Sequence, residues 1–204
     1  MLLYGVVIAG GNAVRMGGLE KPLVHLRGRP LVDHVITRIR PQVARLALNV
    51  KDESAVLYRD TSAQDIPLLA DRFGGAAGPL GGVLAGLEWA ASNGSAWLAT
   101  FPADTPFLPR DLVARLGAST VGQAPAIAVA GGRLQALCAL WPVDCRTALA
   151  EGVASGKFRS LWWTLEEFGA VRCQFDDEAD FFNVNTDEDL GIAERMAAAR
   201  GPAL

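Results

Sequence analysis

Short apolar runs rich in Val, Ile and Leu alternate along this chain with longer segments whose apolar residues recur at helical spacing. We expect strands at about 3–9, 45–50, 66–70, 96–102, 126–130, 134–141 and 170–175. The segments between them predict helices at about 30–41, 53–61, 80–92, 109–117, 144–153, 158–168 and 187–200. Alternation of this kind is typical of βαβ units. It predicts an α/β fold, a mostly parallel sheet with helices on both faces.

Three further patterns support this organisation. The runs at 66–69 and 96–99 are apolar at successive positions, as strands covered on both faces require. Gly131-Gly132 separates two apolar runs and predicts a hairpin. The sequence has no internal repeat and no linker, and the Pro/Gly-rich stretch Phe73–Gly82 is short enough to be an active-site loop. We therefore expect one domain over residues 1–204.

Composition and charge exclude several classes of protein. The net charge is −3, which argues against a nucleic-acid binder with a broad basic face. The apolar N-terminus lacks a basic region before it and is short, and no apolar run approaches the roughly 18 residues that span a bilayer. The cysteines show no CxxC spacing, which favours free thiols in a reducing compartment. We expect a cytoplasmic protein that binds neither nucleic acid nor membranes.

The segment Ile8–Lys21 carries the most chemical information. A buried strand runs into four glycines between Gly10 and Gly18, together with Arg15 and Lys21. Glycines allow a backbone to approach a phosphate chain and turn its N–H groups toward it, and the two cations would balance the charge. The segment is neither a Walker A loop nor a GxGxxG dinucleotide loop. The alternative is a glycine-rich turn with two solvated cations.

Polar residues follow three other expected strands. Asn49, Asp71 and Asp104 stand at the carboxyl ends of the runs at 45–50, 66–70 and 96–102. Ligands of open parallel sheets bind outside those ends, near the point where strand order reverses. These residues and the glycine loop are therefore expected to share one crevice. Asn49 and Asp71 could instead be turn formers or helix caps.

Asp104 is a candidate magnesium ligand. It follows a buried strand and lies between Pro102 and Pro106. One or two carboxylates, with substrate phosphates and water, are enough to bind Mg²⁺. The alternative role of Asp104 is to cap the following helix. That role is less favoured, because the prolines and Thr105 already shape this turn.

Two amides, Asn183 and Asn185, occupy alternate positions, so they share one face if the chain is extended. They are candidates for a second metal ligand or an acceptor contact, and the alternative is capping of the helix at 187–200. For Thr186, which Asp187, Glu188 and Asp189 follow, we expect the capping role. His25 and His34 lie in apolar patterns without ligand-like spacing, so we expect structural roles for both.

Several motifs together resemble molybdenum cofactor guanylyltransferase, a family of the nucleotidyltransferase superfamily. They are Ala9-Gly10-Gly11, Arg15-Met16-Gly17-Gly18, Lys21, Gly78-Pro79-Leu80-Gly81-Gly82, Asp104-Thr105-Pro106-Phe107-Leu108-Pro109 and Phe182-Asn183-Val184-Asn185-Thr186. The resemblance implies a Rossmann-like fold of the nucleotide-diphospho-sugar transferase type. It also implies transfer of GMP from GTP to the terminal phosphate of molybdopterin or Mo-molybdopterin, with Mg²⁺ and release of pyrophosphate. Contact with proteins that insert or accept the molybdenum cofactor is a further implication.

The resemblance also assigns roles to residues. The positions that match the family's GTP contacts are Ile8, Ala9, Gly10, Gly11, Lys21, Asn49, Asp71 and Asp104. By the same resemblance Asp104 holds Mg²⁺, Lys21 and Arg15 stabilise charge on the phosphates, and Asn183 and Asn185 match a motif of the acceptor pocket and metal. Asp71 would accept hydrogen bonds from the N1–H and N2–H₂ edge of guanine.

The chain departs from the family's pattern at a few positions. Gln135-Ala136, within Leu134–Leu137, stands where many members carry a His-Pro pair, and Glu20 stands where the family often has Asp. Ala9-Gly10-Gly11, in place of Ala-Ala-Gly, favours guanine over cytosine. Two alternatives stay open: transfer of CMP or another nucleotide to a different phosphorylated acceptor, and a nucleotide-binding protein that has lost turnover.

Overall fold

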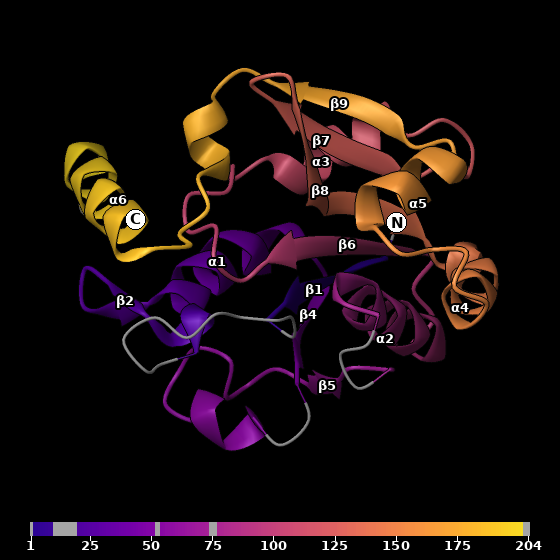
Figure 1. Ribbon diagram of the computed structural model, residues 1–204, viewed down its shortest axis with the longest axis horizontal. Helices are drawn as coiled ribbons and strands as arrows, with labels where there is room; N and C mark the ends of the chain where they lie inside the picture. Colours follow the sequence, from indigo (N-terminus) through magenta and orange to yellow (C-terminus); the bar gives the residue numbers. More distant parts are fainter. Residues whose placement is uncertain (1, 10–19, 52–53, 74–76, 202–204) are drawn as a thin grey trace.

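The computed structural model describes residues 2–9, 20–51, 54–73 and 77–201. Seven strands form one sheet in the order β5-β4-β1-β6-β8-β7-β9 (Figure 1). The strands are β1 (Leu3–Ile8), β4 (Arg45–Val50), β5 (Leu68–Ala70), β6 (Trp97–Pro102), β7 (Ala126–Ala130), β8 (Arg133–Pro142) and β9 (Val171–Phe175). The helices are α1 (Leu31–Ile39), α2 (Pro79–Ser92), α3 (Leu112–Ser119), α4 (Arg146–Ala154), α5 (Leu161–Glu167) and α6 (Asp187–Arg200).

The sheet is mostly parallel, as the alternating pattern predicts. β1 pairs in parallel with β4 and with β6, β4 with β5, and β7 with β9. Only β8 runs antiparallel to both of its neighbours among the described strands. The chain places β4 and β5 on one side of β1 and then returns to place β6 on the other. Strand order therefore reverses between β1 and β6, which is where open α/β sheets bind ligands.

Helices cover both faces of this sheet, and the strand residues alternate between them. Leu3 and Val7 of β1 pack with α1 and α3 on one face. Tyr4, Val6 and Ile8 of the same strand pack with α2, α4 and α5 on the other face. Successive side chains of β1 point to opposite faces, and helices cover both faces. All six residues of β1 are therefore buried.

A smaller apolar cluster attaches α6, the helix at the left of Figure 1, to the rest of the molecule. It joins α6 to α1 and to a two-stranded hairpin, β2 (His25–Leu26) and β3 (Arg29–Pro30). Thr186 begins α6 with a capping box, since its hydroxyl accepts from the Asp189 N–H and the Asp189 carboxylate accepts from the Thr186 N–H. The interpretation of Thr186 as a cap is confirmed, and the cap fixes the start of α6 immediately after Asn185.

The expected hairpin at Gly131-Gly132 is also confirmed. Both glycines have positive φ, 55° and 72°, as a tight two-residue turn between antiparallel strands requires. The turn joins β7 to β8, and the register shifts between Ile127 and Ala128. Such a shift bends and twists the paired strands locally.

Some boundaries differ from the sequence-based expectation. The helix expected at 109–117 begins at Leu112, because Asp111 before it has a non-helical backbone. The helix expected at 53–61 is a short 3-10 helix, Ser54–Tyr58, beside residues outside the described part of the chain. His34 is buried and its Nε2 lies 2.9 Å from the Leu26 carbonyl oxygen, as a structural role requires, whereas His25 is exposed. Among the described residues, no helix is long and apolar enough to cross a membrane.

Candidate active site

The carboxyl ends of three neighbouring strands form the floor of the candidate site. In the register of the sheet, Ile8 of β1 pairs with Asn49 of β4 and with Pro102 of β6. The Ala9 N–H donates to the Asn49 carbonyl oxygen at 2.9 Å, and the Ala103 N–H donates to the Ile8 carbonyl oxygen at 3.2 Å. These bonds hold the first residues beyond β1 and β6 side by side. Gly10, Gly11 and Arg15, which the sequence analysis assigns to this site, lie outside the described residues.

Asn49 and Asp71 lie against the first turn of α2. The Asn49 side chain is fully buried and donates from Nδ2 to the Leu69 carbonyl oxygen at 3.1 Å. A Cβ added to Gly82 would stand 2.2 Å from Asn49 Oδ1, and one added to Gly81 would stand 1.9 Å from Asp71 Oδ1. No side chain could be accommodated at either glycine without moving these polar groups. Glycine is therefore required for the helix to approach them this closely.

Among the described residues, two acceptor atoms in this part of the site lack a hydrogen-bond donor. Asn49 Oδ1 and Asp71 Oδ2 are buried, and neither accepts a hydrogen bond from the described residues. The other carboxylate oxygen of Asp71 accepts only weakly, from the Phe73 N–H at 3.4 Å. Buried acceptors without a donor are uncommon and unfavourable. This pair is suited to a ligand that presents N–H or O–H groups.

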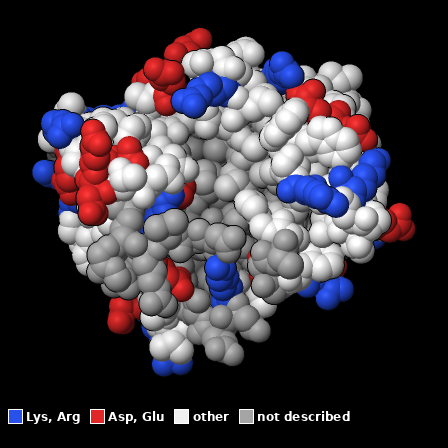
Figure 2. All heavy atoms as spheres, in the orientation of Figure 1, with Lys and Arg blue, Asp and Glu red and all other residues white. Residues whose placement is uncertain are grey.

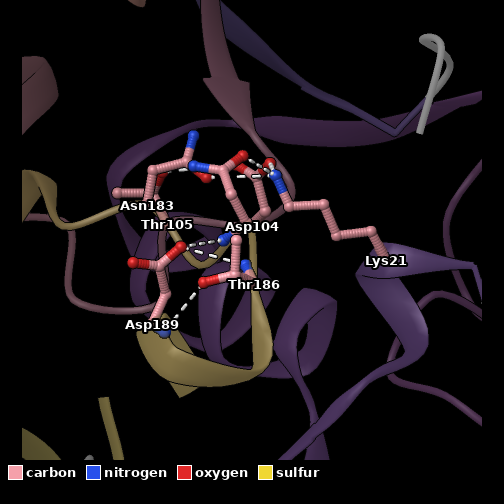
Figure 3. A network of polar contacts seen from close by, with 7 residues as sticks. Lys21, Asp104, Thr105, Asn183, Thr186 and Asp189 are labelled. Carbon is pink, nitrogen blue, oxygen red and sulfur yellow. Dashed lines mark hydrogen bonds and ion pairs between the residues drawn. The ribbon is translucent and has the colours of Figure 1, made fainter. Parts of the chain in front are cut away.

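Lys21 and Asp104 form the second part of the site (Figure 3). Lys21 Nζ lies 2.5 Å from Asp104 Oδ2, and the two side chains are 11% and 19% exposed. The same ammonium donates to Asn183 Oδ1 at 3.2 Å and to Asn185 Oδ1. Lys21 comes from the short 3-10 helix that follows the glycine loop, and Asp104 from the turn after β6. Four candidate residues separated by up to 164 positions therefore meet at one point.

Backbone contacts explain how the two amides reach this point. The Val184 N–H donates to the Asp104 carbonyl oxygen at 3.0 Å, and the Val184 side chain is completely buried. Asn183 and Asn185 flank Val184, so both project to the opposite side, toward Lys21. The expectation that the alternate amides share one face is confirmed.

The donor set around Lys21 is chemically suited to a hard divalent cation. It contains the carboxylate of Asp104 and the amide oxygens of Asn183 and Asn185. Mg²⁺ prefers oxygen ligands and is often held by one carboxylate together with substrate phosphates. The described residues contain no cluster of three or more His, Cys, Asp or Glu that would hold a metal without a substrate.

The sequence analysis missed residues that support this site. Tyr58 is almost completely buried and donates its hydroxyl hydrogen to Glu20 Oε2 at 3.2 Å, next to Lys21 in the chain. Burial, and then the Glu20 carboxylate, raise the pKa of Tyr58 above its ordinary value, so the phenol stays protonated. Gly81 and Gly82 belong to the motif Gly78-Pro79-Leu80-Gly81-Gly82, but the motif alone did not indicate that they contact site residues. Two glycines in the first turn of a helix lower its intrinsic stability. This cost was the sequence signal that the helix backbone approaches another part of the chain closely.

A pocket of about 640 Å³ adjoins the Lys21 cluster. Asn183 and Asn185 line it as well as contacting Lys21, so they connect the two spaces. The volume is within the range of small-molecule sites. The molecular face in Figure 2 is hollowed at its centre, with most of its charged side chains around the rim.

Comparison with known proteins identifies the family. The family model described as "MobA-like NTP transferase domain" matches residues 5–167. A molybdenum cofactor guanylyltransferase of Cereibacter sphaeroides is 43% identical over 196 residues, covering 96% of this chain and 97% of the relative. The protein of the same name from Acidiphilium cryptum is 43% identical over 194 residues, with 94% of each chain covered.

Solved structures agree on the fold. Molybdopterin-guanine dinucleotide biosynthesis protein A from Archaeoglobus fulgidus has a TM-score of 0.75 at 21% identity and covers 96% of this chain and 99% of its own. A 4-diphosphocytidyl-2C-methyl-D-erythritol synthase from Anaerococcus prevotii has a TM-score of 0.74 at 13% identity, covering 96% and 95%. The family model spans most of the chain, and the curated relatives match over nearly their whole length. The chain therefore belongs to the family of MobA-like NTP transferase domains.

Proposed function

We propose that this protein, acting as one nucleotidyltransferase unit over residues 1–204, transfers GMP from GTP to the terminal phosphate of molybdopterin. The observation that carries the proposal is the meeting of Lys21, Asp104, Asn183 and Asn185 beside the strand-order reversal. A cation, a single carboxylate and two amides at that position suit a reaction between phosphates. The names of relatives at 43% identity support guanine as the base and molybdopterin as the acceptor.

The nucleotide base is assigned to the space beside Asn49 and Asp71. Their two unsatisfied acceptors match a base edge with adjacent donors. The N1–H and N2–H₂ groups of guanine offer that edge, whereas cytosine offers an acceptor beside its amino group. A buried acceptor left without a donor costs about 1–3 kcal/mol, which is enough to select one base over another.

The reaction needs charge stabilisation more than proton transfer. An oxygen of the acceptor phosphate attacks the α-phosphorus of GTP, the bond from that phosphorus to the β-phosphate oxygen breaks, and pyrophosphate leaves. Lys21, and Arg15 from the glycine loop, offset the negative charge on the phosphates. Mg²⁺ bound at Asp104 would neutralise charge on the same phosphates. The acceptor phosphate is already ionised near neutral pH, so no protein group has to remove a proton.

The experiment that tests this function compares four nucleoside triphosphates as donors to molybdopterin and measures pyrophosphate release. Only GTP should support release, and Asp71→Asn should reduce the preference for GTP over CTP at least tenfold. Asp65→Asn removes the same charge from an exposed position before β5, whereas Asp71 follows β5, and it is the matched control. Equal use of GTP and CTP by the unmodified protein would refute the base assignment.

Two other functions make different predictions in the same assay. A cytidylyltransferase would release pyrophosphate with CTP. A nucleotide-binding protein without turnover would bind GTP and release none. The presence of both Lys21 and Asp104 favours turnover, because a cation suits the phosphates and a carboxylate suits a metal.

A further inference from the structure

Tyr58 carries a buried polar group that the reaction itself does not use. Its side chain is 1% exposed and lies in the apolar core that α1, β1 and β4 share. A buried hydroxyl group is unfavourable unless it forms a hydrogen bond, and this one donates to Glu20 Oε2 at 3.2 Å. Burial, and then the Glu20 carboxylate, raise the pKa of Tyr58, so the phenol keeps the hydrogen that it donates.

Glu20 is the residue at which the short 3-10 helix Lys21–Leu23 begins. Its carbonyl oxygen accepts from the Leu23 N–H at 2.8 Å, but its carboxylate forms no capping hydrogen bond with the described N–H groups of that helix. The carboxylate reaches Tyr58 instead, 38 positions further along the chain. The bond therefore ties the backbone immediately before Lys21 to the core of the protein.

Further hydrogen bonds fix Tyr58 on the other side of this contact. Its carbonyl oxygen accepts from Thr61 twice, from Oγ1 at 2.7 Å and from the N–H at 3.2 Å. The Ser62 N–H donates to Oδ1 of Asp33 at 2.7 Å, which attaches the same turn to α1. The phenol thus stands on a rigid support, and Glu20 is the partner that it can hold in place.

The backbone position of Lys21 determines where its ammonium group lies. The side chain extends from that backbone to Asp104 (Figure 3), where Nζ lies 2.5 Å from Oδ2. An extended side chain cannot lengthen to compensate for a shift of its own Cα, so the shift is passed on to Nζ. Displacement of a charge-stabilising group by about 1 Å can lower a reaction rate about a hundredfold.

We propose that Tyr58 is a positioning residue for the transfer reaction, because its bond to Glu20 fixes the backbone from which Lys21 reaches the phosphates. This inference rests on the proposed function and deepens it. Tyr58 does not touch the reacting atoms and acts only through Glu20 and Lys21. Glu20→Asp would shorten the carboxylate side chain by about 1.5 Å and should break the contact, whereas Glu20→Gln keeps an acceptor oxygen within reach.

The chain contains two tyrosines, and the other one provides a matched control. Tyr4 is also buried, at 4% exposure, and also donates a hydrogen bond of 3.2 Å, to the Asn93 carbonyl oxygen. It lies near the amino end of β1, whereas the site is at the carboxyl ends of the strands. Tyr4→Phe and Tyr58→Phe each remove one such bond, so their losses of stability in urea denaturation should be similar.

Two measurements separate positioning from stability. In pyrophosphate release from GTP and molybdopterin, Tyr58→Phe should lower kcat about tenfold. The calorimetric Kd for GTP should change less, by under about threefold, because Lys21 keeps its charge. Glu20→Asp should resemble Tyr58→Phe, and Glu20→Gln should keep most of the rate. Tyr4→Phe should leave kcat unchanged.

The second measurement needs no turnover. Mass spectrometry follows acetylation of Lys21 by acetic anhydride without nucleotide, relative to Lys157, which is an exposed reference on the same chain. Tyr58→Phe should raise the relative rate at Lys21 roughly threefold to tenfold, the effect of losing one hydrogen bond that water partly replaces. Tyr4→Phe should not change it.

A double variant tests whether Tyr58 acts through Lys21, since residues that act through one another are not additive. Tyr58→Phe combined with Lys21→Met should be no slower than Lys21→Met alone. Additive losses, or a Tyr58→Phe protein whose kcat and Lys21 acetylation match those of Tyr4→Phe, would overturn the inference. If the unmodified protein releases no pyrophosphate with any nucleotide, the proposed function is refuted, and the acetylation rates still decide whether Tyr58 positions Lys21.

Discussion

The Lys21 ammonium group occupies the position beside Asp104 where a metal cation would be held. Replacing Lys21 should therefore make the Asp104 carboxylate available to a cation. The Lys21 ammonium contacts the Asp104 carboxylate and the amide oxygens of Asn183 and Asn185. A divalent cation must therefore displace Lys21 before it can bind these atoms. Lys21→Met keeps most of the side-chain volume and removes the charge. We expect this variant to bind Mn²⁺, a substitute for Mg²⁺, more tightly than the unmodified protein when no nucleotide is present.

The size of the effect follows from the contact. At an effective dielectric constant of about 20, two unit charges 4 Å apart attract by about 4 kcal/mol. The pair here is closer, 2.5 Å, but both side chains keep some contact with water, at 11% and 19% exposure. Desolvation and side-chain ordering offset much of the attraction and leave a net contribution on the order of 1–3 kcal/mol. Removing that competition should lower the Kd for Mn²⁺ by roughly 5-fold to 150-fold.

Electron paramagnetic resonance of free Mn²⁺ measures this Kd directly. Lys157→Met is the control, because Lys157 pairs with Glu167 at 3.3 Å on the exposed surface and its loss should leave Mn²⁺ binding unchanged. The double variant Lys21→Met, Asp104→Asn should lose the gain. With GTP present, Lys21→Met should bind the nucleotide more weakly, since the charge near the phosphates is lost. Mn²⁺ affinity equal to that of the unmodified protein would refute the argument that Lys21 competes with the metal.

Three further predictions concern the site and its scaffold. Asp104→Ala should fold normally, by circular dichroism, and lower the rate of pyrophosphate release about a hundredfold or more; a near-normal rate at saturating Mg²⁺ would leave Asp104 only a structural role. Gly82→Ala would place a Cβ 2.2 Å from Asn49 Oδ1 and should weaken GTP binding in calorimetry at least about tenfold, whereas Gly117→Ala, which meets no atom within 4 Å, should leave it unchanged. Burial lowers the pKa of His34 below its ordinary value of 6.5, so unfolding takes up a proton and the unfolding free energy should decrease as the pH falls below about 6.5. The unfolding free energy, measured by urea denaturation at several pH values between 5 and 7, should change less with pH in His34→Gln than in the unmodified protein. The same pH dependence in both proteins would exclude His34 as its source.

Local pattern was sufficient for most of the secondary structure. The expected strands at 45–50 and 126–130 have the observed bounds, and so does the helix at 187–200. Apolar spacing and capping residues act over a few positions, so a single sequence contains them in full. The boundaries that differ are those set by the conformation of a turn, such as the start of α3 after Asp111.

The candidate site was predicted in its composition and only partly in its arrangement. Strand-end positions indicated Asn49, Asp71 and Asp104, because parallel strands deliver their carboxyl ends to one edge. Alternate spacing indicated Asn183 and Asn185 as candidates, and the motif resemblance linked them to the acceptor pocket and metal, although they are distant in sequence from the other site residues. The division into two groups was not predictable: Asn49 and Asp71 lie against the glycines of α2, whereas Asp104 pairs with Lys21.

What the sequence by itself determined is therefore the set of elements and the chemical types at their ends. Only the tertiary structure decided which of those groups meet. The Val184 N–H bond to the Asp104 carbonyl oxygen brings the amides to Lys21 across about 160 residues. The start of β8 places Arg133 and Gln135 in the pocket that those amides line. Such contacts depend on the relative free energies of pairing segments far apart in the chain, and no local pattern in either segment contains that information.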